Sequence, residues 1–131
     1  MATKKQQTQE VKTPDLSNVK PIILKDEKNG DVFVLEFNRS SVKFAESRGF
    51  NLASMDESGV SITVIEELFF YAFRMHHPEK SKADTDKILY EKLCGMPEKM
   101  IERLVELYAI PLNALVQTED SAKNASMTAE F

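Results

Sequence analysis

Cysteine occurs once in the 131 residues of this sequence, as Cys94, and tryptophan does not occur at all. A single cysteine excludes an internal disulfide framework and a zinc cluster built on cysteine ligands. No apolar stretch approaches the roughly 20 residues that a membrane-spanning helix needs. Residues 1–10 are polar and lack the apolar segment of a secretory signal peptide. We therefore expect a cytosolic protein.

Recognisable catalytic and ligand-binding motifs are also missing, including Gly-rich phosphate loops and Gly-x-Ser-x-Gly elbows. The only two histidines, His76 and His77, are adjacent at a predicted helix end and point about 100° apart, so they cannot converge on one metal. Asp84 and Asp86 are explained by the favourable placement of acids in a first helical turn. Cys94 is expected to fill a small gap in the core. We predict no enzymatic activity, metal or cofactor.

Length and composition indicate one small globular domain. A chain of 131 residues with 42% hydrophobic and 29% charged residues is typical of a single soluble unit. Residues 1–20 carry four Lys and two acidic residues, which leaves thirteen basic and nineteen acidic residues for the rest, a net charge of −6. A body this acidic is expected to bind nucleic acid poorly.

Two polar segments enclose the predicted domain. Residues 1–18 are rich in Lys, Gln and Thr and contain Pro14, which predicts a flexible N-terminal arm. Residues 118–131 are small and polar without periodicity, which predicts a flexible C-terminal tail. The segment between them, 19–117, is expected to form a single α+β domain with an N-terminal two-stranded β-hairpin followed by about four α-helices.

The domain is predicted to open with the hairpin. Apolar runs at 21–25 and 32–37 flank Asn29 and Gly30, a pair that favours a tight turn because both positions accept positive φ. The two-residue period of a strand places three apolar residues of the second run on one face: Phe33, Leu35 and Phe37. A lone hairpin is marginal in water, so helices or a second subunit must cover that face.

Four helices are expected to follow, at about 40–48, 61–77, 83–94 and 97–109. Asn38 or Ser40 can cap the first of them. Thr63 and Glu66 fit a capping box at the start of the second. After the fourth, Pro111 is expected to restart a last short turn at 112–116.

The second predicted helix is apolar on nearly every side. Within residues 62–75, nearly the only polar residues are Thr63, Glu66, Glu67 and Arg74, and they lie within about 100° of one another. Phe70 falls in the middle of that polar stripe. Such a helix is either central to a core or carries a face for a partner, and the sequence leaves both alternatives open for Phe70.

The order of these elements resembles a known family. The segments VFVLEFNRSSVKFAESRGF, IEELFFYAFRMHHPEKS and IERLVELYAIPL, between polar ends, are similar to the small tail assembly chaperones of long-tailed phages and prophages of Gram-positive bacteria. The resemblance covers about residues 21–112. It implies a non-enzymatic protein of the host bacterial cytoplasm that binds the helical tape measure protein, keeps it soluble and helps tail tube subunits assemble around it.

Binding such a helical client calls for an apolar surface with adaptable aromatic and Met side chains. The residues predicted to form it are Phe69, Phe70, Phe73, Met75, Met100 and Leu107. The same surface suits self-association, so a homo-oligomer is expected.

Two further expectations concern partners and fate. In many relatives a ribosomal frameshift produces a longer form that recruits the tail tube protein, and the codons for Lys123 and Asn124 could contain a slippery heptamer. The alternative function is a structural connector retained in the assembled phage particle, where the apolar helix would be a permanent subunit contact. Presence or absence in purified particles distinguishes the two.

Overall fold

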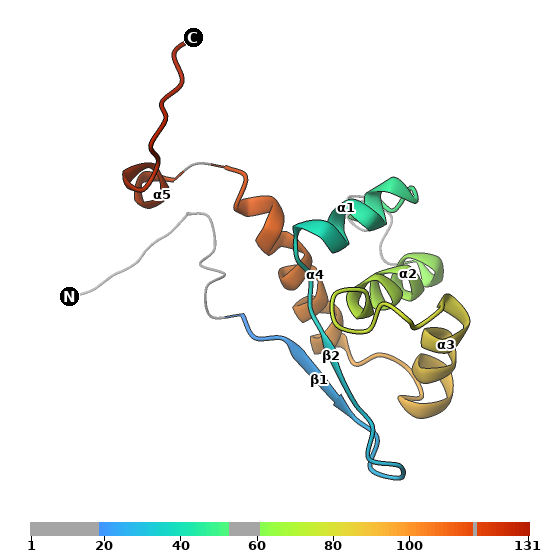
Figure 1. Cartoon of the computed structure of the whole chain (residues 1–131). Coiled ribbons are helices and arrows are strands. Elements are labelled where there is room, and N and C mark those ends of the chain that lie inside the picture. The colour runs from blue at the N-terminus through green and yellow to red at the C-terminus, as the bar shows by residue number, and fades with distance from the viewer. Residues whose placement is uncertain (1–18, 53–60, 117) are drawn as a thin grey trace, which may run out of the picture.

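The computed structural model describes residues 19–52, 61–116 and 118–131, so the predicted arm at 1–18 lies outside the described residues. A two-stranded antiparallel hairpin precedes the helices (Figure 1), which confirms the predicted α+β class. The elements are β1 (Ile22–Lys25), β2 (Val32–Leu35), α1 (Arg39–Ser47), α2 (Ile62–Phe73), α3 (Lys82–Lys87), the π-helix η2 (Ile88–Lys92), α4 (Glu98–Asn113) and α5 (Glu119–Lys123).

The hairpin forms where it was predicted, but its turn is longer than a tight Asn-Gly turn. Lys25 pairs with Val32, so the chain reverses over residues 26–31. Gly30 has a φ of 82°, whereas Asn29 does not adopt positive φ. The Asn29 side chain instead accepts a hydrogen bond from the Asp31 amide at 2.9 Å. This hydrogen bond from a backbone amide to the Asn29 side chain is typical of a loop longer than a two-residue turn.

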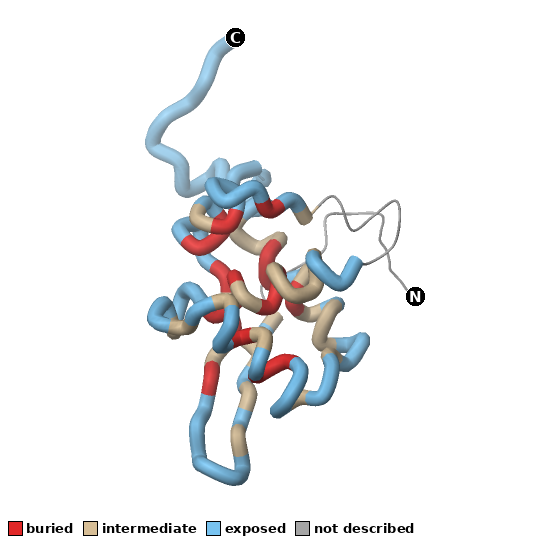
Figure 2. Tube along the Cα trace, turned by 90° about the vertical axis from the view of Figure 1, so that its right-hand side faces the viewer, coloured by how far each residue is buried: buried red, intermediate tan, exposed pale blue. Residues whose placement is uncertain are grey.

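The apolar face of β2 packs against the helices, as its alternation predicted. Figure 2 shows the buried residues gathered along the middle of the chain trace, whereas the hairpin tip extends beyond the helices. Phe33 lies with its ring centroid 5.6 Å from that of Phe73. Phe37 makes an edge contact with Tyr108 at 5.0 Å. Aromatic contacts thus connect the hairpin to α2 and α4.

The C-terminal end of α2 closes the outer edge of β2. The Glu36 amide donates to the Ala72 carbonyl at 3.1 Å, and the Val34 amide donates to His77 Nε2 at 2.9 Å. His76 lies on the surface and contacts the Glu36 carboxylate at 2.8 Å. The expected surface position is therefore correct for His76, whereas His77 is half-buried and contacts the sheet, and both residues lie beyond the end of α2.

The first two helices begin at clear side-chain caps. Asn38 caps α1, with its side chain and that of Ser41 each accepting the other's backbone amide. Ser61 caps α2 by accepting from the Val64 amide at 3.1 Å. The predicted capping box of Thr63 and Glu66 is therefore wrong, because both residues lie inside the helix. The helix also ends at Phe73 rather than near residue 77.

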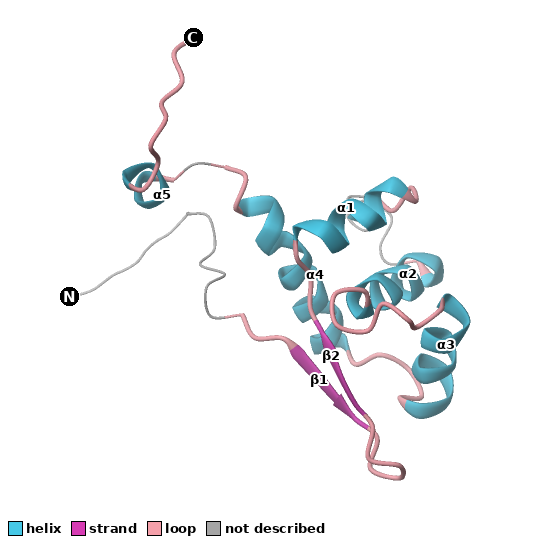
Figure 3. Ribbon diagram, viewed as in Figure 1, coloured by secondary structure: helices cyan, strands magenta, loops and turns pink. Residues whose placement is uncertain are grey.

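The third predicted helix is divided into α3 and the π-helical turn η2, drawn as one continuous ribbon in Figure 3. Leu93 donates to the Ile88 carbonyl at 2.9 Å, which closes the wider turn. The chain then leaves the helix through Cys94 and Gly95, at φ values of 57° and 111°. Cys94 is exposed, so the prediction that it fills a core gap is wrong.

Near the C-terminus the structure differs from the predicted helices in two places. The fourth helix was expected to end near residue 109, but α4 continues through Pro111 to Asn113. Pro111 has no backbone amide to donate to the Leu107 carbonyl, so the helix lacks one hydrogen bond near its C-terminal end. The segment 118–131 was expected to lack periodic structure, yet it contains α5, capped by Thr118. Residues 118–131 are all exposed.

Candidate protein-interaction surface

Three of the six residues predicted to bind a partner lie inside the core. Phe69, Phe73 and Leu107 are at most 1% exposed. Phe73 packs between Phe33 and Phe69, with ring centroids 5.6 and 5.0 Å away. These side chains cannot reach a partner while the domain is folded. The prediction is wrong for them because α2 is covered on several sides, by β2, α1, α3 and α4.

The other three predicted residues are more accessible. Phe70 is half-buried, with its ring centroid 5.1 Å from that of Tyr71, and packs on the edge of the core. Met100 is also half-buried against the core, and Met75 is exposed just after α2. With three members inside, the structure does not bring the six residues together on one surface.

A different set of apolar residues faces solvent. On α4 and its last turn, five residues recur at helical spacing beside the core face: Ile101, Val105, Ala109, Leu112 and Val116. We call this set the α4 stripe. Its first three members are half-buried, whereas Leu112 and Val116 are exposed, Val116 by 69%. Val116 lies in the turn that follows α4, where its amide donates to the Asn113 carbonyl at 3.1 Å.

The α4 stripe begins at a shallow apolar hollow of about 170 Å³. The hollow is lined by Ile62, Ile65, Leu89, Tyr90, Gly95, Met96 and Ile101. Ile62, at the start of α2, is 72% exposed. The hollow and the stripe share Ile101, so a partner that contacts the stripe can place an apolar side chain in the hollow.

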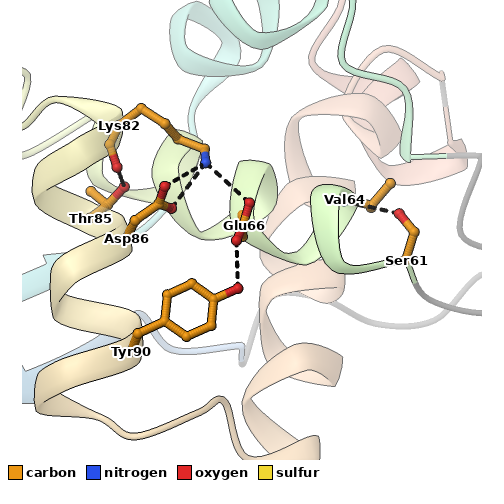
Figure 4. A network of polar contacts seen from close by, with 7 residues as sticks. All are labelled: Ser61, Val64, Glu66, Lys82, Thr85, Asp86 and Tyr90. Atoms are coloured by element: carbon orange, nitrogen blue, oxygen red, sulfur yellow. Dashed lines mark hydrogen bonds and ion pairs between the residues drawn. The ribbon is translucent and has the colours of Figure 1, made fainter.

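A polar network holds Tyr90, one wall of the hollow (Figure 4). Its hydroxyl donates to the Glu66 carboxylate, which also accepts from Lys82 Nζ at 3.4 Å. Lys82 in turn contacts Asp86 at 2.9 Å. The hydrogen bond from Tyr90, together with the charge of Lys82, lowers the pKa of Glu66 below its ordinary value. The carboxylate therefore stays ionised at neutral pH and fixes the position of the tyrosine ring.

A second cavity, a cleft of about 430 Å³, lies between the hairpin loop and η2. An ion pair between Lys92 and Asp26 crosses from one side to the other, and this contact lowers the pKa of Asp26. The lining combines an apolar part with both lysines and acids: Leu24, Lys25, Asp26, Glu27, Lys28, Asn29, Phe33, Ile88, Glu91, Lys92 and Leu93. Because both signs of charge are present, the cleft does not specify a charged ligand.

Metal-binding clusters and membrane-spanning helices are both absent from the described residues. Within residues 19–52, 61–116 and 118–131, no group of three or more His, Cys, Asp or Glu side chains is placed to hold a metal ion. No helix in those ranges has both the length and the apolar character needed to cross a membrane. The absence of enzymatic activity stays a prediction.

Sequence reasoning missed the α4 stripe, although a signal for it was present. The apolar residues of α4 cover roughly 160° of its circumference, which is wider than the roughly 100° that one packed face requires. Leu104, Leu107 and Tyr108 form the buried part. The part of this apolar face that lies beside the buried residues corresponds to the α4 stripe.

The comparison with protein families covers nearly the whole chain. A family model described as a domain of unknown function (DUF5055) matches residues 7–131. The chain belongs to the DUF5055 family. No curated protein and no solved structure matches the chain. The family description carries no activity, so the function of this DUF5055 protein must be argued from its surface.

Proposed function

We propose that this DUF5055 protein is a phage tail assembly chaperone that binds the tape measure protein and keeps it soluble while tail tube subunits assemble. The observation that carries the proposal is the α4 stripe with its hollow, an apolar surface left open to solvent on an acidic domain. Contiguous exposed apolar surface on a small domain is typical of a protein-binding site.

The geometry of that surface supports a helical client. An amphipathic helix can pack its apolar face along another helix that presents apolar residues at the same helical spacing, and the α4 stripe has that spacing. A long helical protein with apolar faces aggregates until those faces are covered, and a chaperone covers them transiently. The proposed role is non-enzymatic and takes place in the host bacterial cytoplasm. It includes self-association, and a longer frameshifted form that recruits the tail tube protein.

Co-expression with the tape measure protein of the same gene cluster tests the proposal. We expect the tape measure protein to be insoluble alone and to elute with this chain as a soluble stoichiometric complex. No binding, with the solubility of the tape measure protein unchanged, would overturn the proposal. Stoichiometric recovery of the chain in purified particles would replace it with the connector function.

A pair of surface variants localises the effect. Leu112→Glu introduces a charge into the α4 stripe and should reduce the recovery of soluble tape measure protein. Val32→Glu makes the same kind of change at an exposed position of β2, away from the stripe, and should leave recovery unchanged. Urea unfolding of both variants confirms that each is folded, so that a loss of recovery is assigned to the surface.

A further inference from the structure

A row of acidic residues borders the α4 stripe. Glu98, Glu102 and Glu106 recur every four residues along α4, and all three are exposed. Glu102 and Glu106 directly follow Ile101 and Val105, so they lie about 100° around the helix from the stripe. The opposite border of the stripe is the buried core face. The solvent side of the apolar surface therefore carries negative charge.

These carboxylates have few cationic partners within the described part of the chain. Glu106 contacts Arg103 at 3.6 Å, and this exposed pair contributes little stability. Glu98 and Glu102 form no ion pair there. The helix dipole explains an acid at Glu98, in the first turn, but its effect falls off within that turn. Glu102 is therefore exposed and forms no ion pair within the described residues, which leaves its charge available to a partner.

We propose that the α4 stripe binds an amphipathic helix whose apolar face is bordered by Lys or Arg side chains, which pair with the acidic row. The inference rests on the proposed function for the identity of the partner, which is a basic amphipathic segment of the tape measure protein. Residues 101 to 116 span about 22 Å at 1.5 Å per residue, so the segment needs about four helical turns.

The charges also select against a second copy of this chain as the occupant. In a two-fold symmetric pair of antiparallel α4 helices, each acidic row would face the same row of the partner. Like charges that face each other across an interface repel, which disfavours this pairing. A partner with the opposite charge beside its apolar face gains attraction from the same three residues. The occupant is therefore a basic helix of another protein.

Two synthetic helical peptides of about 18 residues test the charge preference. Both carry Leu at alternating spacings of three and four residues, and they differ only in having Lys or Glu beside the Leu face. Titration of the full chain should show the Lys peptide binding about tenfold more tightly at low salt. The difference should shrink at high salt, because exposed charges are screened.

Charge reversal assigns the preference to the row. The triple variant Glu98→Lys, Glu102→Lys and Glu106→Lys should bind the Glu peptide more tightly than the Lys peptide. The control triple variant, Glu27→Lys, Glu79→Lys and Glu119→Lys, has the same net charge and alters exposed acids elsewhere, so it should keep the original preference. Equal binding of both peptides, or a preference that both triple variants change equally, would overturn the inference.

Two results separate this inference from the proposed function. Binding of the Lys peptide at the row, together with failure to bind the tape measure protein, would retain the basic-helix site and reject the client. Undiminished binding of the tape measure protein by the Glu98, Glu102 and Glu106 triple variant would retain the client and reject the charge preference. A concentration-dependent dimer in sedimentation that Leu112→Glu dissociates would also overturn the inference, because a second copy would then occupy the stripe.

Discussion

The imidazole of His77 accepts a hydrogen bond from the backbone amide of Val34 across 2.9 Å, although 43 positions separate them in the chain. An accepting Nε2 requires a neutral ring with its proton on Nδ1. The same ring lies 5.4 Å from the ring of Phe33 and 6.1 Å from that of Phe73. One side chain thus connects the turn after α2 to both the backbone and the apolar face of β2.

Replacement of His77 with Ala should lower the free energy of unfolding by about 1–3 kcal/mol, because the Val34 amide loses its partner in a half-buried site. His76→Ala is the matched control. It removes only an exposed contact with Glu36 and should cost less than about 1 kcal/mol. Urea denaturation measures both changes, and equal losses would show that the His77 hydrogen bond contributes nothing.

Two separate alanine substitutions test which residue caps the start of α2. Ser61→Ala removes the acceptor of the Val64 amide and should cost about 1 kcal/mol. Thr63→Ala places a better helix former at an exposed interior position and should change the stability by less than about 0.5 kcal/mol. A larger loss from the Thr63 change than from the Ser61 change would contradict the position of the cap.

The neighbours Phe69 and Phe70 should respond differently to truncation. Phe69→Ala leaves a cavity in the core and should lower the free energy of unfolding by about 3–5 kcal/mol. Phe70 is only partly buried, so Phe70→Ala should cost about 1–2 kcal/mol. Thermal and urea unfolding provide the comparison. The idea that Phe70 lies at the edge of the core fails if the two losses are the same.

Alkaline pH should destabilise the fold through Tyr108. Burial, with smaller contributions from Glu46 and Tyr71, raises the pKa of Tyr108 from 10.0 to about 12. The folded state therefore keeps this proton more tightly than the unfolded state, so stability is intact below pH 10 and falls as pH rises toward 12.

Phe at position 108 provides the control for that pH dependence. The Tyr108 hydroxyl has no hydrogen-bond partner in the described structure, so Tyr108→Phe should change neutral-pH stability by less than about 1 kcal/mol. It should also flatten the alkaline decline measured by denaturant unfolding between pH 8 and pH 11, a range chosen from about two units below to about one unit above the ordinary tyrosine pKa. An unchanged decline in the variant would assign the effect to other groups.

Cys94 should react rapidly with a thiol reagent in the native protein, because its side chain is exposed. Its φ of 57° is a left-handed conformation that suits glycine. Cys94→Gly should therefore retain stability within about 1 kcal/mol of the parent. A thiol that reacts only after urea is added would contradict its position on the surface.

Local patterns predicted much of the fold. The alternation in β2 identified the face of Phe33, Leu35 and Phe37, because the two-residue period depends only on backbone geometry. The cap of α2 was missed because Ser61 and Thr63 are both suitable residues two positions apart. The Glu66 side chain, which the capping box assigned to Thr63, instead contacts Lys82 and Tyr90, and a local pattern does not contain such tertiary contacts.

The candidate site was harder to predict for the same reason. Composition indicated that α2 carries more apolar surface than a small domain usually buries, but not which neighbours cover it. Phe69 and Phe73 are covered by packing against other elements, and the open surface lies on α4 instead. Distinguishing a core face from a binding face requires knowing how the helices are arranged.

The closure of β2 by α2 also limits how copies of this protein can aggregate. Val34 and Glu36 use their outward amides on His77 and Ala72, so an incoming strand cannot extend the sheet on that side. Hydrogen bonding between hairpins is then confined to β1. Two hairpins joined in this way would form a sheet that ends at both borders, so fibril growth by successive strand addition has no route through the native fold.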